Sequence, residues 1–173
     1  RVAHGGMVAS RSMCAAEEQL VLAVALGGLP AKPRDAIDSL AVSGWRGLQL
    51  DARMAGTRPH ELGGSARRDL AGRIKRRQLL LTGIDLWLPD GAFLDPSTQE
   101  RAVDRTIECM RLAADLGAPA ISTVLPEPEW HTQMQPALEA VLSEAESLGV
   151  RVADYSAGAH ITPELRPHVH AHV

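Results

Sequence analysis

The chain has 173 residues, with 18 Lys and Arg against 21 Asp and Glu, so its net charge is −3. Apolar residues make up 45% and charged residues 23%. This composition is typical of a globular domain and excludes a disordered chain or a collagen-like repeat. The charge balance argues against a polybasic nucleic-acid-binding protein. Cys14 and Cys109 lie far apart and form no zinc motif or disulfide framework, which favours a reducing, cytoplasmic location.

The length predicts one domain with a core of its own. We expect a disordered lead-in over residues 1–18, a single α/β domain over 19–157 and a His-rich tail over 158–173. The apolar run 20–26 is too short to cross a membrane. Glu17 and Glu18 precede it where a secretory signal would be positively charged, so we interpret the run as a buried strand.

Strands and helices are predicted to alternate along the domain. Short apolar runs, typical of strands buried on both faces, cover residues 20–26, 47–50, 79–88, 120–125 and 150–153. Apolar residues at helical spacing predict helices over residues 33–43, 66–77, 96–116 and 134–148. Ser65 is the expected N-cap of the second helix, and Asp95 with Pro96 the expected start of the third.

The resulting β-α-β-α-β-α-β-α-β order predicts a parallel sheet joined by right-handed crossovers. Two architectures have this pattern. A (β/α) barrel needs about 250 residues for eight units. A five-stranded doubly wound sheet of flavodoxin type needs fewer residues, and the length alone favours it.

The residues themselves favour the barrel. Residues 26–30 and 43–51, then 81–89, 95–98, 110–117 and 148–153, resemble successive segments of the xylose isomerase-like sugar phosphate isomerase/epimerase family. The resemblance covers about residues 20–155. It implies a TIM barrel of which this chain holds the N-terminal part, with about five strands and four helices. It also implies an isomerase or epimerase that moves a proton beside the carbonyl of a sugar or sugar phosphate.

Enzymes of this family commonly bind a divalent metal, and the first ligand is usually a Glu that ends the fifth strand. In this sequence Tyr155 stands where that Glu would be, and Asp154 lies one residue early. A one-residue offset turns a strand side chain to the opposite face. The competing hypothesis is therefore a non-catalytic or truncated barrel fragment that acts as a binding domain and has lost the metal site.

Acidic residues follow several of the predicted strands, where parallel sheets bind their ligands. Asp51 and Asp85 come directly after apolar runs and are the candidate acid/base or substrate-orienting residues. Glu127 and Asp154 are the candidate ligands of Mn²⁺ or Mg²⁺, which prefer oxygen donors. Glu129 lies nearby. The alternative is that these residues are caps and solvated loop residues.

Three further residues are candidates for substrate binding. Trp87 and Trp130 could stack on a sugar ring or close the top of the core. Gly28, with Gly27, could cradle a phosphate. The sequence contains no G-x-G-x-x-G and no GK[ST], which argues against binding of dinucleotides and of P-loop nucleotides.

Two clusters remain outside this scheme. His168, His170 and His172 would share one face of an extended strand and could bind Zn²⁺ or Ni²⁺, with His160 as a fourth ligand. Pro163 and Pro167 favour a frayed terminus instead. The second predicted helix is rich in basic residues, which could contact a sugar phosphate or nucleic acid, or form a solvated outer face. These residues are Arg67, Arg68, Arg73, Lys75, Arg76 and Arg77.

The expected partner is thus a small sugar or sugar phosphate, with no nucleic acid and no membrane. An incomplete barrel would leave the edges of its first and fifth strands without neighbours, and unpaired strand edges promote association. The sequence therefore predicts a homodimer formed through exposed sheet edges.

Overall fold

A computed structural model describes residues 21–89, 91–126, 131–155 and 169–171. For residues 131–133 and 169–171 it describes the backbone alone. The expected disordered lead-in over residues 1–18 lies outside the described residues, as does most of the tail.

The described residues form a six-stranded sheet, four α-helices and two short 3-10 helices. The strands are β1 (Ala23–Ala25), β2 (Gly47–Asp51), β3 (Leu80–Asp85), β4 (Ala120–Thr123), β5 (Arg151–Asp154) and β6 (Val169–Ala171). The α-helices are α1 (Pro33–Val42), α2 (Gly64–Arg76), α3 (Gln99–Leu116) and α4 (His131–Leu148). The 3-10 helices are η1 (Leu26–Gly28) and η2 (Pro59–Glu61).

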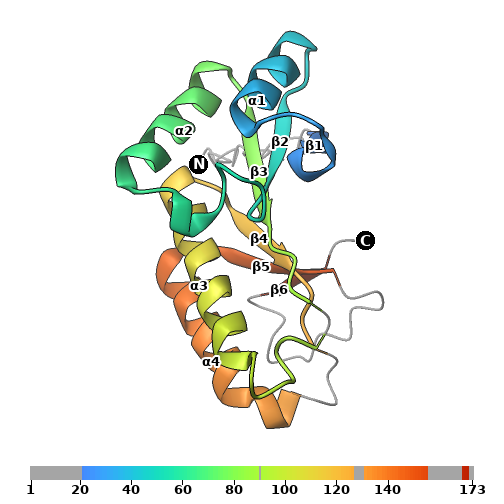
Figure 1. Ribbon diagram of the computed structural model, residues 1–173, viewed down its shortest axis with the longest axis vertical. Coiled ribbons are helices and arrows are strands. Elements are labelled where there is room, and N and C mark those ends of the chain that lie inside the picture. Colours follow the sequence, from blue (N-terminus) through green and yellow to red (C-terminus); the bar gives the residue numbers. More distant parts are fainter. Residues whose placement is uncertain (1–20, 90, 127–130, 156–168, 172–173) are drawn as a thin grey trace, which may run out of the picture.

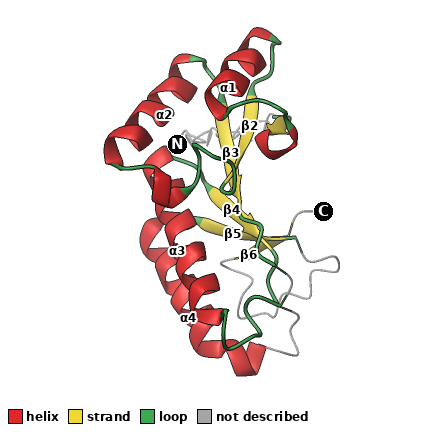
Figure 2. Cartoon of the chain, in the orientation of Figure 1, coloured by secondary structure: helices red, strands yellow, loops and turns green. Residues whose placement is uncertain are grey.

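The order of the strands decides between the two expected architectures. All neighbouring strands are parallel, and their order in the sheet is β1-β2-β3-β4-β5-β6, the same as in the chain. In a flavodoxin-type sheet the strand order is 2-1-3-4-5, so the connection after the second strand moves across the sheet in the opposite direction to the first connection. Here every crossover moves one strand further in the same direction, as in a barrel, so right-handed crossovers place the helices on one face. Figures 1 and 2 show α1 to α4 along one side of the curved sheet. The flavodoxin-like alternative is wrong.

The core lies between this helix layer and the sheet. Leu50, Ile84, Ile121 and Val152 lie side by side across four strands, and all are fully buried. They belong to one apolar cluster with helix residues, among them Ile37, Ile74, Met110, Leu112 and Val141. Burying each such side chain contributes about 1.5–3 kcal/mol. These side chains therefore fix which face of the sheet the helices cover.

An irregularity in β3 decides which side chains occupy the opposite, inner face. Leu48 pairs with Leu81, but Gln49 pairs with Gly83, so Thr82 is an extra residue. The Thr82 hydroxyl donates to the carbonyl oxygen of Leu48 at 3.0 Å. An extra residue reverses the alternation of side chains beyond it. As a result Leu81 faces the helices, whereas Asp85 faces the same side as Gln49.

Several boundaries differ from the predicted ones. β1 covers residues 23–25 of the predicted run 20–26, β3 ends at Asp85 within the predicted run 79–88, and β4 ends at Thr123 within 120–125. α2 begins at Gly64 with Gly63, not Ser65, as its N-cap. α4 begins at His131 rather than at residue 134.

The start of the third helix was predicted wrongly for a clear physical reason. The Asp95 carboxylate accepts hydrogen bonds from the backbone N–H and the hydroxyl of Ser97, both at 2.8 Å. Asp95 therefore stabilises a local turn instead of capping the helix. An Asp side chain can do either, because it can accept hydrogen bonds from nearby backbone N–H groups in both conformations. α3 starts at Gln99, after Thr98.

The tail contributes a strand that we did not expect. Residues 169–171 form β6, which pairs in parallel with β5 and places His170 opposite Ala153. Pro163 and Pro167 both precede the paired segment, so their missing N–H groups do not interrupt its ladder. His160, His168 and His172 lie outside the described residues, and the predicted Zn²⁺ or Ni²⁺ site stays a prediction.

No helix in the described part of the chain combines the length and the apolar character needed to cross a bilayer.

Candidate functional site

Polar side chains gather on the inner face at the carboxyl ends of the strands. Asp51 ends β2 and pairs in register with Asp85, which ends β3. Asp85 in turn pairs with Ser122 of β4. All three side chains are buried. The two aspartates predicted from the sequence are therefore neighbours at one edge of the sheet.

Asp85 is the centre of a hydrogen-bond network. Its Oδ1 accepts hydrogen bonds from Gln49 Nε2 at 2.6 Å, from the Tyr155 hydroxyl at 3.0 Å and from the Ser122 hydroxyl. Gln49 Nε2 also lies 3.0 Å from Ser122 Oγ and 3.2 Å from the Tyr155 hydroxyl oxygen. The network joins side chains from β2, β3, β4 and the end of β5. Three donors on one oxygen hold the carboxylate in a fixed orientation.

Asp51 has a different partner. Its Oδ1 accepts the backbone N–H of Arg53 at 2.7 Å, and the Arg53 guanidinium contacts both carboxylate oxygens, at 3.2 and 3.0 Å. This hydrogen bond, helped by the charges of Asp51 and Asp85, raises the pKa of Arg53. The guanidinium carbon lies 5.5 Å from the centre of the Trp87 ring, within range of a cation–π contact. Arg53 is thus a cation held beside both carboxylates.

The two glycines after β1 differ sharply. A Cβ atom on Gly27 would overlap Oδ2 of Asp51, whereas a Cβ on Gly28 would meet nothing within 4 Å. Only a glycine at position 27 lets the chain pass this close to the carboxylate. The structure shows no contact of Gly28 that requires glycine, and its binding of substrate stays a prediction.

Comparison with solved structures identifies this architecture. A xylose isomerase domain protein from Planctomyces limnophilus superposes with a TM-score of 0.64 at 15% identity, over 86% of this chain and 60% of that one. The fold is that of a xylose isomerase-like TIM barrel. The D-psicose 3-epimerase of Clostridium cellulolyticum H10, crystallised with D-tagatose, matches with a TM-score of 0.60 at 13% identity, over 76% of this chain and 50% of that one. The probable 3-DHS dehydratase AsbF of Bacillus anthracis matches with a TM-score of 0.60 at 12% identity, over 78% and 52%.

This chain thus spans about half to 60% of the length of these xylose isomerase-like barrels, so it contains an incomplete barrel. No family model matches the sequence, and no curated protein matches it.

The end of β5 explains how Tyr155 and Asp154 diverge in this xylose isomerase-like barrel. Asp154 pairs with Thr123 and shares the strand face of Val152, which points to the helices. Its Oδ1 accepts the backbone N–H of Leu125 at 3.0 Å. Tyr155 comes next and its hydroxyl reaches Asp85 on the inner face. The expected consequence of the one-residue offset is therefore visible in the structure.

The donor set that the structure describes does not fit a metal ion. Within the described residues, no three His, Cys, Asp or Glu side chains come together as a metal site would require. Asp154 faces away from Asp51 and Asp85, and a tyrosine stands at the position where the resembling family has Glu. Glu127 and Glu129 lie outside the described residues, so a Mn²⁺ or Mg²⁺ site that includes Glu127 stays a prediction.

The two tryptophans and the basic helix are the remaining candidates from the sequence, and the structure describes them to different extents. Trp87 is 52% exposed beside Arg53 and accessible to a ligand, whereas Trp130 lies outside the described residues. Arginines of the basic helix α2 pair with carboxylates: Arg67 with Asp115 at 2.6 Å, and Arg73 with Asp38 at 2.7 Å. Arg77, the C-cap residue of α2, also pairs with Asp38, at 2.8 Å. These pairs favour the solvated outer face over a surface for nucleic acid or sugar phosphate.

Three residues of the site were not predicted from the sequence: Gln49, Arg53 and Ser122. A signal existed for two of them. Gln49 interrupts the apolar run 47–50 two positions before Asp51, and side chains two apart share a strand face. Ser122 similarly interrupts the run 120–125. No local pattern marks Arg53, which turns back onto Asp51 two residues earlier. Gly27 was expected to cradle a phosphate, and the structure shows instead its close approach to Asp51.

Proposed function

We propose that this inner edge binds a sugar and that the chain functions as part of a sugar or sugar phosphate isomerase or epimerase. The observation that carries the proposal is the pairing of Asp51 and Asp85 on adjacent strands of a xylose isomerase-like barrel, with Arg53 beside them. Structural neighbours support the choice of sugar, since D-psicose 3-epimerases were crystallised with D-fructose and D-tagatose.

The proposed reaction is a proton transfer beside a sugar carbonyl. A base removes the proton from the neighbouring carbon, the C–H electron pair forms the carbon–carbon double bond, and the carbonyl π pair moves to its oxygen. An acid then returns a proton to the opposite face of that carbon, which gives the epimer. Return of the proton to the former carbonyl carbon, with loss of a hydroxyl proton, gives the isomer.

The described side chains suit separate roles in this reaction. The three donors around Asp85 all contact Oδ1, which leaves Oδ2 as the oxygen that these side chains offer to a ligand, so Asp85 is the proposed base. Tyr155, hydrogen-bonded to it and therefore on the same side of the substrate, is the proposed acid for return of the proton to the former carbonyl carbon. Arg53 can stabilise the negative oxygen that forms, because a positioned cation acts where charge develops. Asp51 holds Arg53 and is the proposed orienting group.

Deuterium exchange tests this proposal directly. The chain is incubated in D₂O with D-psicose, D-fructose or D-tagatose, or with D-fructose 6-phosphate, and proton NMR follows both the exchange beside the carbonyl and the epimer. We expect Asp85→Asn to lower the exchange rate by about 100-fold or more. The matched control is Asp38→Asn, which removes a carboxylate on α1 in the outer helix layer. Exchange at the wild-type rate in Asp85→Asn would overturn the role of Asp85.

A second candidate function is a sugar-binding domain without catalysis. The observation that favours it is the end of β5, where Tyr155 replaces the expected metal-binding Glu and Asp154 faces the helices. Isothermal titration with the same sugars separates the two functions. Saturable binding without deuterium exchange would support the binding domain, and the absence of binding to any of them would reject both functions.

Association through an exposed sheet edge is also part of the proposal. The fifth strand does not have the expected free edge, because β6 pairs with β5. β1 is a three-residue strand at one edge of the sheet, preceded by the exposed Leu22. An unpaired edge is a template for another chain. Light scattering after size exclusion should report a dimer, and a monomer at all concentrations would exclude it.

A further inference from the structure

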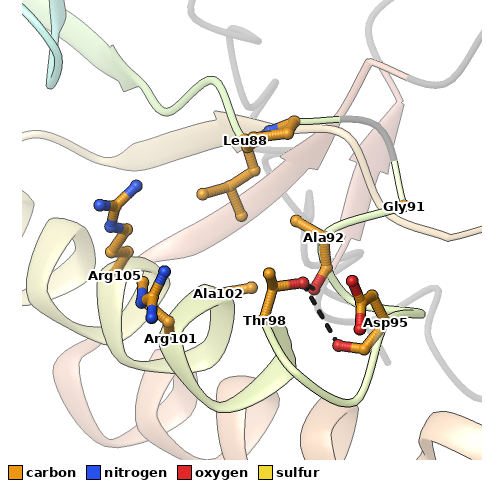
Figure 3. A pocket seen from close by; sticks show the side chains of 9 residues that line it. Leu88, Gly91, Ala92, Asp95, Thr98, Arg101, Ala102 and Arg105 are labelled. Carbon is orange, nitrogen blue, oxygen red and sulfur yellow. Dashed lines mark hydrogen bonds between the residues drawn. The ribbon is translucent and has the colours of Figure 1, made fainter.

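A cavity of about 230 Å³ lies between the loop after β3 and the first turns of α3. Its floor is apolar, formed by the buried residues Leu88, Ala92 and Ala102. Figure 3 shows the side chains of Arg101 and Arg105 on one side of this space and Asp95 on the other. None of these residues belongs to the network around Asp51 and Asp85.

The two arginines lie one helical turn apart on α3, and both are exposed. In the part of the chain that the structure describes, the side chains of Arg101 and Arg105 form no ion pair and no hydrogen bond. Arg111, on the same helix, pairs with Glu144 at 2.8 Å, and Arg67 and Arg73 pair with carboxylates on other helices. Two like charges four residues apart repel each other. The helix therefore presents at the cavity two cations that pair with no carboxylate among the described residues.

The other polar side chains of the cavity, Thr98 and Asp95, form hydrogen bonds within the protein. The Thr98 hydroxyl donates to the carbonyl oxygens of Ala92 and Asp95, at 2.9 and 3.2 Å. Asp95 Oδ1 accepts two hydrogen bonds from Ser97, which lower the pKa of Asp95, so this carboxylate remains charged. Recognition of a ligand thus depends on a positive end made by the arginines and a negative end made by Asp95.

We propose that this cavity binds the phosphate group of a small phosphorylated molecule. Two guanidinium groups can each donate paired hydrogen bonds to phosphate oxygens, which is the geometry that favours Arg over Lys at such sites. The apolar floor accommodates the carbon skeleton next to the phosphate. The negative charge of Asp95 disfavours a second anionic group at the far end, so the preferred ligand carries one phosphate. The inference does not depend on the proposed sugar chemistry at Asp85.

Titration of the intact chain with inorganic phosphate and with D-fructose 6-phosphate tests the proposal. Isothermal titration gives the affinity, and ¹H–¹⁵N NMR spectra locate the site through the amides of residues 91–105. We expect both ligands to bind saturably with shifts centred on those amides, and D-fructose 6-phosphate to bind more tightly than phosphate. Arg101→Gln and Arg105→Gln should each weaken binding about tenfold, since each removes a charge-assisted contact.

The control variant is Arg68→Gln, an exposed arginine on α2 outside the cavity. It should bind phosphate like the wild type. Failure of both ligands to saturate would overturn the proposal. So would binding that survives when Arg101→Gln and Arg105→Gln are combined, or an equal loss of affinity in Arg68→Gln. Arg105→Lys is a further check, because it keeps the charge but loses the paired donors. Wild-type affinity in Arg105→Lys would contradict the paired recognition.

Discussion

The Tyr155 hydroxyl donates a hydrogen bond to Oδ1 of Asp85 across 3.0 Å, and so links the end of β5 to the end of β3. The strand between them, β4, contributes Ser122 to the same oxygen. Asp85 is only 8% exposed, whereas Tyr155 is 40% exposed. A residue at the mouth of the incomplete barrel thus reaches the buried carboxylate around which the inner edge is organised.

The first prediction concerns the strength of this link. Tyr155→Phe removes the hydroxyl that contacts both Asp85 and Gln49. We expect the free energy of unfolding to fall by about 1 kcal/mol, because Asp85 and Gln49 still bind each other. Urea unfolding measures the change. Ser147→Ala is the control, since that hydroxyl contacts only a carbonyl of its own helix, and an equal loss in the two variants would show that Tyr155 adds nothing specific.

A second prediction uses the two adjacent glycines. In Gly27→Ala the new Cβ would overlap Oδ2 of Asp51 and lie 3.1 Å from Cβ and Cγ of the same residue. The carboxylate cannot swing aside freely because Arg53 holds both of its oxygens. We expect a loss of about 1–3 kcal/mol in unfolding free energy.

Gly28→Ala provides the matched comparison for Gly27→Ala, because its Cβ would meet nothing. Its unfolding free energy should stay within about 0.5 kcal/mol of the wild type. Equal effects of the two substitutions in denaturant unfolding would contradict the close approach of Gly27 to Asp51.

The third prediction concerns acid pH and the outer helix layer. Asp38 on α1 accepts hydrogen bonds from Arg73 of α2 and from Arg77, the C-cap residue of that helix. The bond from Arg77 is the main reason that the pKa of Asp38 is lowered below the ordinary value. A lowered folded-state pKa stabilises the protein at pH values above the unfolded pKa. The stabilisation is lost as the pH falls through the folded pKa.

We therefore expect Asp38→Asn to lose less unfolding free energy than the wild type as the pH is lowered through the acid range. Urea unfolding at a series of pH values measures this. Asp35→Asn, on the same helix, is the control, because Asp35 forms no ion pair in the part of the chain that the structure describes. Parallel pH profiles for the wild type and Asp38→Asn would show that the pair contributes nothing.

Sequence patterns predicted the helix and strand order because buried parallel strands are continuous apolar runs, and this pattern does not depend on tertiary contacts. Asp51 and Asp85 were identified for the same reason, since each comes directly after buried apolar residues. The pairing register of β3 with β2 could not be predicted from the sequence. The extra residue Thr82 turns Asp85 toward Gln49, and nothing in the run 79–88 marks where pairing shifts.

Sequence patterns gave a wrong helix boundary where the same residues can form either a helix start or a turn. Asp95 and Pro96 suit a helix start, but Asp95 bonds to Ser97 and forms a turn, so α3 begins later. The strand in the tail was missed because three paired residues are too few to give a periodic pattern. The close approach of Gly27 to Asp51 joins separate segments, and only the folded chain brings them together.

The last prediction addresses the position that separates this chain from the metal-binding pattern of the family that it resembles. Tyr155→Glu would place a second carboxylate near Asp85 on the inner face. Without metal the two like charges repel, so the variant should unfold at a lower temperature than the wild type. Mn²⁺ would neutralise both, and at about 100 times its dissociation constant a bound ion stabilises a protein by about 2.7 kcal/mol. Thermal melts with and without Mn²⁺ should therefore show a gain in Tyr155→Glu beyond any gain in the wild type. Tyr155→Gln, which carries no charge, should show no such excess. If Mn²⁺ raises the melting temperature of all three proteins equally, position 155 plays no part in metal binding and any ion is held elsewhere.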